Sequence, residues 1–486
     1  MEMEFKQTAY KYLRPSLFNT QTVEQTQEIK LTEDMPDVGS VIGAWGQCIL
    51  RSKQWNGSSA SVSGGVMCWV LYKPSEEGDL QKAECWIPFQ CRLDLPGSGQ
   101  EGLLRCSCQL SSMEGRMVSA RRIMLRCSVG IITEALERDE VVISSPTAIP
   151  DDIQLKLESY PLLLPRESGE LQVVLDEDVP FTDDGKLLRC QVQCSVTEQK
   201  VSGSRLVVRG MANGRILYLK NDDCMEKMDF EIPFSHVTEL DREYGDGSMV
   251  SVVPVVTDLD PELQPGMLSV RGGLACQYLV YERIMTEIAT DAYSPCRNVE
   301  ISMSPLAAPM HLDSAILAFT LDGQLEHDAV PFDTELVLEP GVTSNPDAPN
   351  KLVVSGGWKT ADLDAGQQTI PVAGEMDWQN TDKCVLHCWM QPAGWPVVSG
   401  NSVRGKVNLL LTAWAEESPQ MITAISCGEI QQRDAKRPSI VIRKKKAEES
   451  LWQVAKKNSS TVSAILLANN LQHDIADEML LLIPTV

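Results

Sequence analysis

The chain has 486 residues, of which 43% are hydrophobic and 23% charged, as in an ordinary folded protein of about three or four domains. Its 43 basic and 67 acidic residues give a formal net charge of −24, which excludes a general attraction to nucleic acid or anionic lipid. The segment Met1–Phe5 is acidic where a signal peptide would be basic, and no apolar stretch approaches the roughly 18 residues of a membrane span. We therefore expect a cytoplasmic protein with no membrane span and no nucleic-acid partner.

The chain is strand-like from its beginning to about residue 430. Runs rich in Val, Ile, Thr and aromatic residues alternate with polar residues and stop at Gly, Pro, Asp or Asn. Long amphipathic helical patterns are nearly absent before residue 445. This pattern predicts a mainly β protein.

Two segments of the chain share the same order of motifs. Gly64 leads into a strand that ends at Tyr72, and Gly210 leads into one that ends at Tyr218 with the same spacing. An acidic, polar turn and an Ile-Pro-Phe motif follow in both, at 87–89 and at 232–234. The shared order predicts two copies of one β domain.

A third, shorter copy can be traced further along. Residues 352–356 parallel 206–210, and Ile370-Pro371-Val372 stands where Ile-Pro-Phe is expected. The strand that ends in tyrosine is missing from this copy, so we expect it to be degenerate or rebuilt. Segments 144–146 and 303–309 are expected to link the copies.

The Ile-Pro-Phe motif has an architectural explanation. Proline cannot donate to a sheet ladder, so we expect it to end a strand or to lie on a sheet edge, while Ile and Phe anchor the core. We predict three tandem antiparallel sandwich- or barrel-like β domains and a small C-terminal module. The expected ranges are 1–140 (with an N-terminal lead-in), 141–295, 296–431, and 432–486 for the linker and module.

Fifteen cysteines are present, an odd number. In a reducing compartment we expect them to be free and to pack as small apolar side chains. The close pairs lack the matching second half of a zinc site, so we expect no metal. These pairs would share a strand face: Cys106 and Cys108, Cys190 and Cys194, and Cys384 and Cys388.

The tail differs in composition and pattern from the rest. A strand is predicted at 439–442, a helix that begins after Ser450, a second helix over 461–469 capped by Thr461, and a closing strand at 480–484. The segment from residue 438 onward contains six basic and five acidic residues, so the net negative charge of the chain comes almost entirely from the residues before it. We expect Lys444, Lys445 and Lys446 to form a solvated turn or to attract an acidic partner.

This β-α-α-β tail resembles a LysM domain. Leu451-Trp452 with Ala455-Lys456 match the first helix, and 482–484 match the last strand. Trp452 is expected in the core of the module. The usual Gly-Asp-Thr turn is replaced by Glu448-Glu449-Ser450, which departs from a sugar-binding groove. The resemblance implies partner-binding loops made of Glu448, Glu449, Ser450, Asn469, Asn470 and Leu471.

The upstream copies resemble the SPOCS domain of clostridial sporulation proteins, most closely over about 205–283. Several such copies before one LysM domain is the layout of a spore-coat family that binds the coat morphogenetic ATPase SpoIVA. The resemblance implies a scaffold at the forespore surface, on the mother-cell side, which agrees with the cytoplasmic expectation. It also leaves self-association through free sheet edges open.

The sequence shows no phosphate-binding loop, nucleophile elbow or paired histidines for zinc, so we expect no enzyme, no catalytic residues, no cofactor and no metal. Three weaker alternatives are a Cys–His pair at His387 and Cys388, carboxylate pairs, and an aromatic sugar platform. The carboxylate pairs are Asp258 with Asp260 and Asp362 with Asp364, and the tryptophans are Trp378, Trp389, Trp395 and Trp414. Turn formation and core packing are the ordinary roles of such residues.

The two resemblances imply two alternative functions. The first is a non-enzymatic scaffold of spore-coat assembly that docks a SpoIVA-like ATPase through its tail. The alternative is a LysM protein of the cell envelope that binds peptidoglycan.

Overall fold

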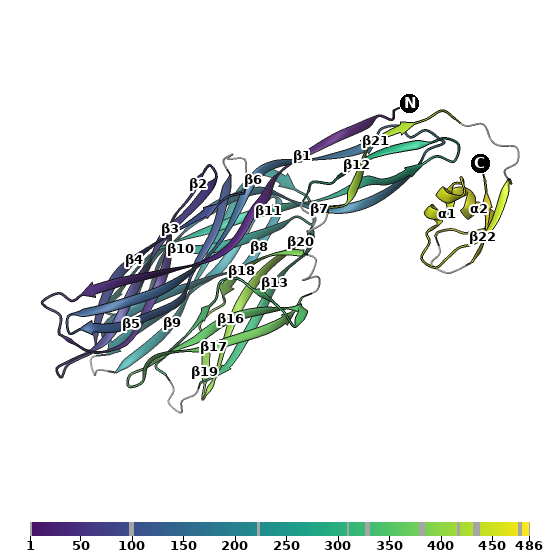
Figure 1. Cartoon of the computed structure of the whole chain (residues 1–486). Helices are drawn as coiled ribbons and strands as arrows, with labels where there is room; N and C mark the ends of the chain where they lie inside the picture. Colours follow the sequence, from purple (N-terminus) through teal and green to yellow (C-terminus); the bar gives the residue numbers. More distant parts are fainter. Residues whose placement is uncertain are drawn as a thin grey trace.

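The structure is a computed structural model that describes residues 2–96, 102–220, 224–308, 311–325, 331–378, 384–415, 418–430, 438–474 and 479–485, without the side chains of 311–313 and 349. Within these ranges the chain is mainly β, with 23 strands and two short helices, as predicted. Figure 1 shows an elongated body of long strands, an arm at one end and a small C-terminal module beside the arm. Among the described residues, no helix has the length and apolarity to span a membrane.

The first unit (β1–β6) consists of two antiparallel sheets, ordered β1-β6-β5 and β2-β3-β4. Val66 and Ile87 of one sheet share a buried cluster with Leu125 of the other, which is the arrangement of a sandwich. The strands are β1 (Phe5–Lys30), β2 (Val38–Asn56), β3 (Ser59–Pro74), β4 (Gln81–Asp94), β5 (Leu103–Ser119) and β6 (Arg122–Pro146).

The second unit (β7–β11) has one sheet ordered β10-β11-β7 and a facing sheet of β8 and β9. β8 folds back on itself near Gly203, where φ is +60°. Thr197 Oγ1 donates to the carbonyl of Arg209 at 3.3 Å, so the two halves of β8 lie side by side. The strands are β7 (Gln154–Pro180), β8 (Gly185–Lys220), β9 (Met225–Tyr244), β10 (Met249–Gln264) and β11 (Met267–Tyr293).

The third unit (β12–β21) contains the sheet β13-β20-β18 with β19 on β20, the sheet β14-β16-β15 with β17 on β16, and the pair β12-β21. In each unit a strand near its start pairs with one near its end: β1 with β6, β7 with β11, and β12 and β13 with β21 and β20. In each unit the strand that contains the motif proline, β4, β9 or β17, pairs with the strand that precedes it in the chain. The strands are β12 (Val299–Pro305), β13 (His311–Gln324), β14 (Asp333–Leu338), β15 (Thr343–Asn345), β16 (Ala348–Asp362), β17 (Gly366–Asp377), β18 (Cys384–Pro392), β19 (Val397–Ser399), β20 (Ser402–Ala415) and β21 (Gln420–Cys427).

The three prolines of the shared motif lie on sheet edges. Pro88, Pro233 and Pro371 belong to β4, β9 and β17, each of which pairs with one neighbour only among the described strands. Each proline is exposed, and in the first two units the flanking Ile and Phe are buried. The edge prediction is therefore confirmed, whereas the prediction of a strand end is wrong, because the motif lies in mid-strand and pairing continues beyond it.

The glycine that precedes each motif pairs with its last residue across the hairpin. Gly64 is opposite Phe89, Gly210 is opposite Phe234, and Gly356 is opposite Val372. A Cβ atom at Gly210 would lie 2.2 Å from the Phe234 ring and 2.5 Å from the carbonyl oxygen of Ser195. The glycine thus leaves room for the aromatic ring, which covers its backbone.

Three other expectations about the chain path are wrong. Residues 144–146 are the end of β6, and residues 303–305 of the predicted link 303–309 are the end of β12, so these residues are strand. Residues 306–308 lie outside the strands, and residue 309 lies outside the described residues. Both segments are polar or proline-containing, yet they pair as strands of the arm. The strand thought missing from the third copy is present as β16, which lacks only the final tyrosine.

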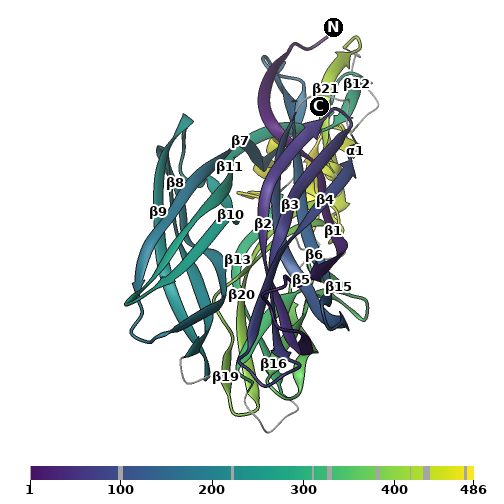
Figure 2. The ribbon, with the colours of Figure 1, turned by 90° about the vertical axis from the view of Figure 1, so that its left-hand side faces the viewer.

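The three units pack side by side, and their cores are shared. Figure 2 shows the strands of the second unit beside those of the first, with the third unit alongside. One buried cluster joins Leu136 of β6, Leu279 of β11 and Trp414 of β20, one residue from each unit. Another joins Trp45 of β2, Leu217 of β8 and Ala361 of β16. Units that share cores in this way form one body.

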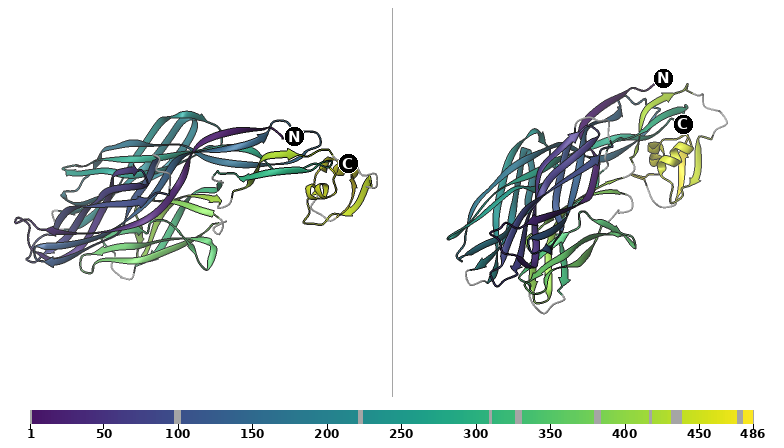
Figure 3. Two further views of the ribbon diagram at one scale, coloured as in Figure 1. Left: turned by 45° about the horizontal axis from the view of Figure 1, so that its top comes forward. Right: turned by 60° about the vertical axis from the view of Figure 1, so that its left-hand side comes forward.

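The arm is built from the ends of the longest strands. The start of β1 pairs with the end of β6, the start of β7 with the end of β11, and β12 with β21. These ribbons bury Tyr12, Leu162 and Leu306 in one cluster and Met3, Ala292 and Ile425 in another. Figure 3 shows the arm extending from the body toward the C-terminal module.

The C-terminal module has the predicted order of strand, helix, helix and strand. Its elements are β22 (Ile440–Lys444), α1 (Leu451–Lys457), α2 (Val462–Ala468) and β23 (Leu480–Pro484). Ser450 caps α1 in a capping box with Gln453, and Thr461 caps α2, as the sequence indicates. The helices pack on one face of the β22–β23 pair, where Leu481 and Ile483 are fully buried.

Candidate functional site

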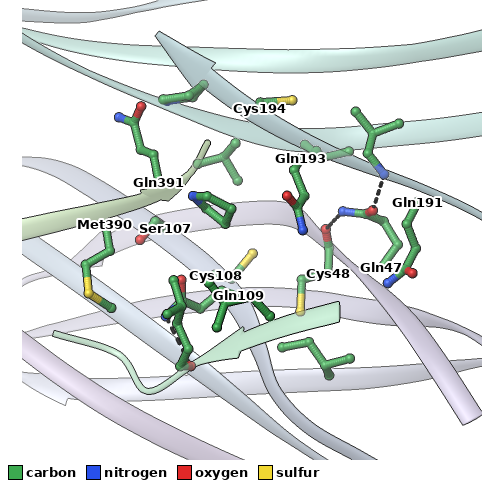
Figure 4. Close-up of a pocket in the computed structure, with 18 of the residues that line it drawn as sticks. Gln47, Cys48, Ser107, Cys108, Gln109, Gln191, Gln193, Cys194, Met390 and Gln391 are labelled. Atoms are coloured by element: carbon green, nitrogen blue, oxygen red, sulfur yellow. Dashed lines mark hydrogen bonds between the residues drawn. The ribbon is translucent and has the colours of Figure 1, made fainter. Parts of the chain in front are cut away.

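A cavity of about 120 Å³ lies where the three units meet. β2 and β5 of the first unit, β8 and β10 of the second, and β14 and β18 of the third line it. Figure 4 shows the amide side chains of Gln47, Gln191, Gln193 and Gln391 around this space, together with the sulfurs of Cys48 and Cys108. A volume of this size holds a few water molecules, since each occupies roughly 30 Å³.

Glutamine side chains connect neighbouring units at this junction. The amide of Gln277 accepts from the N–H of Cys106 at 2.9 Å and donates to its carbonyl at 2.6 Å. Gln367 makes the same pair of hydrogen bonds with Ala44, at 3.1 and 3.0 Å. Gln391 bonds the N–H of Val196 and the carbonyl of Val252. Each amide satisfies backbone groups of another unit that have no strand partner at that point.

A buried carboxylate also collects donors from two other units. Asp333 of β14 accepts from Arg189 of β8 at 2.8 Å and from the indole N–H of Trp45 of β2 at 3.0 Å. Burial alone would raise the pKa of Asp333, but Arg189 and Arg215 outweigh it and hold that pKa below its usual value. The charged groups therefore join the units without leaving an unpaired buried charge.

The residues considered above as weaker catalytic, ion-binding or sugar-binding candidates have structural roles. His387 stacks on Phe18 with ring centroids 4.3 Å apart, and its Nδ1 lies 3.4 Å from a carboxylate oxygen of the buried Glu134. Asp362 accepts from the N–H groups of Asp364 and Ala365 and so forms a turn, as expected. Asp258 and Asp260 instead lie within β10, so the turn interpretation is wrong there. Trp378, Trp389 and Trp414 are buried core residues, and Trp395 lines the cavity.

Across the described ranges, no three His, Cys, Asp or Glu side chains gather closely enough to hold a metal ion. Most of the cysteines are buried, in keeping with small apolar side chains.

The two predicted partner-binding loops come together at one end of the module. The backbone N–H of Leu451 donates to Oδ2 of Asp474 at 3.0 Å, which joins the segment after Ser450 to the segment after Leu471. Glu448 and Asn470 are exposed, and Asn470 has a positive φ of 52°. These two side chains are the accessible members of the predicted set.

Four members of that set also have internal structural roles. Glu449 is buried and contacts Arg443 at 2.9 Å and Lys457 at 3.0 Å, and hydrogen bonds from these cations lower its pKa. The amide of Asn469 bonds both backbone groups of Leu482, at 2.7 and 2.8 Å. Leu471 packs against the apolar core, and Ser450 caps α1. The loops therefore form a fixed end of the module.

Lys445 differs from its expected place in a solvated turn. Its side chain is 1% exposed, and its backbone N–H donates to the carbonyl of Met479 at 2.8 Å. The backbone bond continues the β22–β23 pairing by one residue, opposite Met479, and strand alternation then turns Lys445 to the inner face that also carries Leu481 and Ile483.

The outer face of β22–β23 is an apolar surface that the sequence analysis missed. Ile440, Ile442, Leu480 and Leu482 are 57%, 62%, 66% and 41% exposed, although all four are large apolar side chains. They alternate with Val441, Leu481 and Ile483, which face the helices. The signal was present in the sequence, because both strands are apolar at consecutive positions, and one helical layer covers only one face. We call these four residues the outer sheet face.

The opposite side of the module contacts the arm. Asp291 of β11 accepts from the indole N–H of Trp452 at 2.7 Å and from Lys456 at 2.6 Å. The hydroxyl of Tyr293 donates to the carbonyl of Ser460 at 3.0 Å, and its ring meets that of Trp452 at 4.9 Å. Trp452 packs against the core of the module as expected, but it is half-buried rather than fully buried and also makes this contact with the arm. Figure 1 shows the helices α1 and α2 on the side of the module nearer the arm and β22 on the far side.

Comparison with known proteins matches one part of the chain. The family model described as "SipL, SPOCS domain" matches residues 185–264, which span β8, β9 and β10 of the second unit. No curated protein and no solved structure matches. The second unit is therefore similar to a SPOCS domain over these residues.

Proposed function

We propose that this protein is a non-enzymatic scaffold of spore-coat assembly that docks a SpoIVA-like coat morphogenetic ATPase through its C-terminal module. It would act in the mother-cell cytoplasm at the forespore surface. The SPOCS match of the second unit carries the sporulation context. The first and third units, which have the same pairing order, would be further copies of that domain, and the module would be a LysM-like domain.

The shared junction supports the scaffold role. Three units whose amide side chains and ion pairs bond one another's backbones form a stiff body. Such a body holds the arm and the module at a defined distance. The exposed edge prolines Pro88, Pro233 and Pro371 oppose strand addition at β4, β9 and β17, so self-association would use other surfaces.

The outer sheet face is the surface that supports docking best. Exposed apolar side chains on adjacent strands form a patch of the kind that marks protein contacts. The exposed Lys444 and Lys446 flank it, and these cations favour an acidic rim on the partner. Glu448 and Asn470 would lie at the border of the contact rather than at its centre.

The alternative function is peptidoglycan binding by the LysM-like loops. Glu449, Asn469 and Leu471 are engaged inside the module, which leaves few polar groups for a sugar. A pull-down from sporulating-cell lysate separates the two functions, with the full chain compared with one that ends before Pro438. Capture of the ATPase by the full chain alone supports docking. Failure to capture it, with sedimentation of the full chain on purified cell wall, supports the alternative.

A further inference from the structure

Two cysteines of the first unit lie directly opposite each other on adjacent strands. Cys68 of β3 pairs with Cys85 of β4, between the pairs Val66–Ile87 and Val70–Ala83. Those flanking side chains are buried in the sandwich, so the two thiols face the same interior side. Directly opposed residues on antiparallel strands have Cα atoms about 4.5 to 5.5 Å apart, within the range of about 4.4 to 6.8 Å that disulfides span.

The two thiols interact with each other and differ in their acidity. The neighbouring thiol of Cys85 and burial raise the pKa of Cys68, and Sγ of Cys68 donates to the carbonyl of Val66 at 3.2 Å. The neighbouring thiol of Cys68 lowers the pKa of Cys85. Cys85 is therefore the sulfur that more readily becomes a thiolate, which is the reactive form of cysteine.

The position of β4 makes one of the two thiols accessible. β4 is the edge strand of the sheet β2-β3-β4, and among the described strands it pairs with β3 alone. Cys85 is half-buried, whereas Cys68 behind it is fully buried. This order places an accessible nucleophile in front of a protected second thiol.

We propose that Cys68 and Cys85 form a dithiol modification site that a small disulfide, such as oxidised glutathione, converts into a cross-strand disulfide. The Cys85 thiolate attacks one glutathione sulfur, forms a mixed disulfide and releases one glutathione. The sulfur of Cys68 then attacks that of Cys85 and displaces the second glutathione, whose departing thiolate takes the Cys68 proton. Two protein thiols are oxidised, and one glutathione disulfide is reduced to two thiols.

The product ties an edge strand to its single neighbour. β4 carries Ile87 and Phe89 of the first core, so a covalent bond to β3 opposes fraying of that edge. The site is independent of the proposed docking function, since it lies in the first unit and not in the module.

The test treats the reduced full chain with oxidised glutathione, blocks the remaining thiols and maps peptides without reduction. The expected result is a linked pair of peptides that contain Cys68 and Cys85 and lack two hydrogen atoms. The unfolding temperature should rise, and dithiothreitol should reverse the rise. A stable mixed disulfide on Cys85, or a link from Cys85 to the nearby Cys127, would overturn the proposal.

Variants assign the two roles. Cys68→Ser should trap glutathione on Cys85, whereas Cys85→Ser should leave Cys68 unmodified, because that thiol is buried. Cys388→Ser, a buried cysteine of the third unit, is the matched control and should form the link as the unaltered chain does. A link that survives Cys85→Ser, or disappears in Cys388→Ser, would count against the site. If a variant fails to fold, the peptide map of the unaltered chain still decides whether the Cys68–Cys85 disulfide forms.

Discussion

Nε1 of Trp452 donates to Oδ2 of Asp291 across 2.7 Å, although the residues are 161 positions apart in the chain. The other oxygen of the same carboxylate accepts from Lys456 at 2.6 Å. One side chain at the tip of β11 thus holds two groups of α1. This contact fixes the side of the module that faces the arm and leaves the outer sheet face available to a partner.

Removing that carboxylate should release the module. Hydrogen bonds to a charged group contribute about 1.5 to 3 kcal/mol, so Asp291→Ala should weaken the contact by roughly tenfold to a hundredfold. A protease site placed between Gly428 and Pro438 allows the linker to be cut, after which gel filtration measures how much module stays bound. Glu287→Ala, at an exposed acid of the same strand, is the control and should change nothing. Unchanged retention in Asp291→Ala would contradict the role of this contact.

Gln277→Ala should destabilise the body. It leaves both the N–H and the carbonyl of Cys106 without a partner in the buried junction, at a cost of about 1 to 3 kcal/mol for each group. Chemical denaturation should show this as a lower midpoint of unfolding. Gln27→Ala is the matched control, because Gln27 is exposed and its side-chain amide donates only to the carbonyl of the adjacent Glu28 among the described residues. Equal midpoints for the two variants would show that the junction amides contribute little.

Gly210→Ala tests the close packing of glycine under the aromatic ring. The added methyl would lie 2.2 Å from Phe234 and 2.5 Å from a backbone oxygen, and overpacking of this kind costs about 1 to 3 kcal/mol. The unfolding temperature should therefore fall. Gly245→Ala provides the comparison, because a Cβ there meets nothing within 4 Å. If neither substitution lowers the unfolding temperature, the added methyl group at residue 210 must be accommodated by a shift of the Phe234 ring and the backbone that costs no stability.

Lys359 should give the body a specific pH dependence. Its side chain is 2% exposed, Nζ donates to the carbonyl of Ala44 at 2.7 Å, and burial lowers its pKa to about 8. The unfolded chain has an ordinary lysine pKa of about 10.4, so between these values the unfolded state binds more protons. The contribution of Lys359 to stability therefore rises with pH from about 8 to 10.

The effect of Lys359 is measured as a difference between two proteins, since burial raises the pKa values of cysteines such as Cys106 and Cys276, and in the unfolded chain cysteines and tyrosines titrate near their ordinary pKa values of about 8.5 and 10. Lys359→Met should be most stabilising, relative to the unaltered chain, near pH 7. That advantage should shrink by as much as roughly 3 kcal/mol by pH 10. A difference in unfolding free energy that does not vary with pH would mean that Lys359 is not held with a lowered pKa.

The elements of this fold were more predictable than their assembly. Strand alternation, the proline motif and the cap residues Ser450 and Thr461 are local signals, and the structure places them on edges and helix starts as expected. The joining of the units depends on pairs such as Gln277 and Cys106, which are 171 residues apart, and a glutamine in a strand carries no sign of its partner. The arm was missed for a related reason, because residues 144–146 look like a linker in the sequence, whereas in the structure they pair with the start of β1.

The predicted binding loops show the same limit. Asn469 and Leu471 match a family pattern, but that pattern does not reveal that one side chain bonds Leu482 and the other packs in the core. The outer sheet face could have been read from the consecutive apolar residues of both strands, had the single layer of helices been considered.

The most direct test of the docking proposal measures binding of the full chain to the purified coat morphogenetic ATPase. Ile442→Glu places a charge at the centre of the outer sheet face, whereas Leu467→Glu alters an 82% exposed leucine on α2 outside that face. The account predicts that Ile442→Glu weakens binding at least tenfold with the module still folded, and that Leu467→Glu binds like the unaltered chain. Equal binding by all three proteins would contradict docking through the outer sheet face, and no binding by the unaltered chain would contradict the proposed partner.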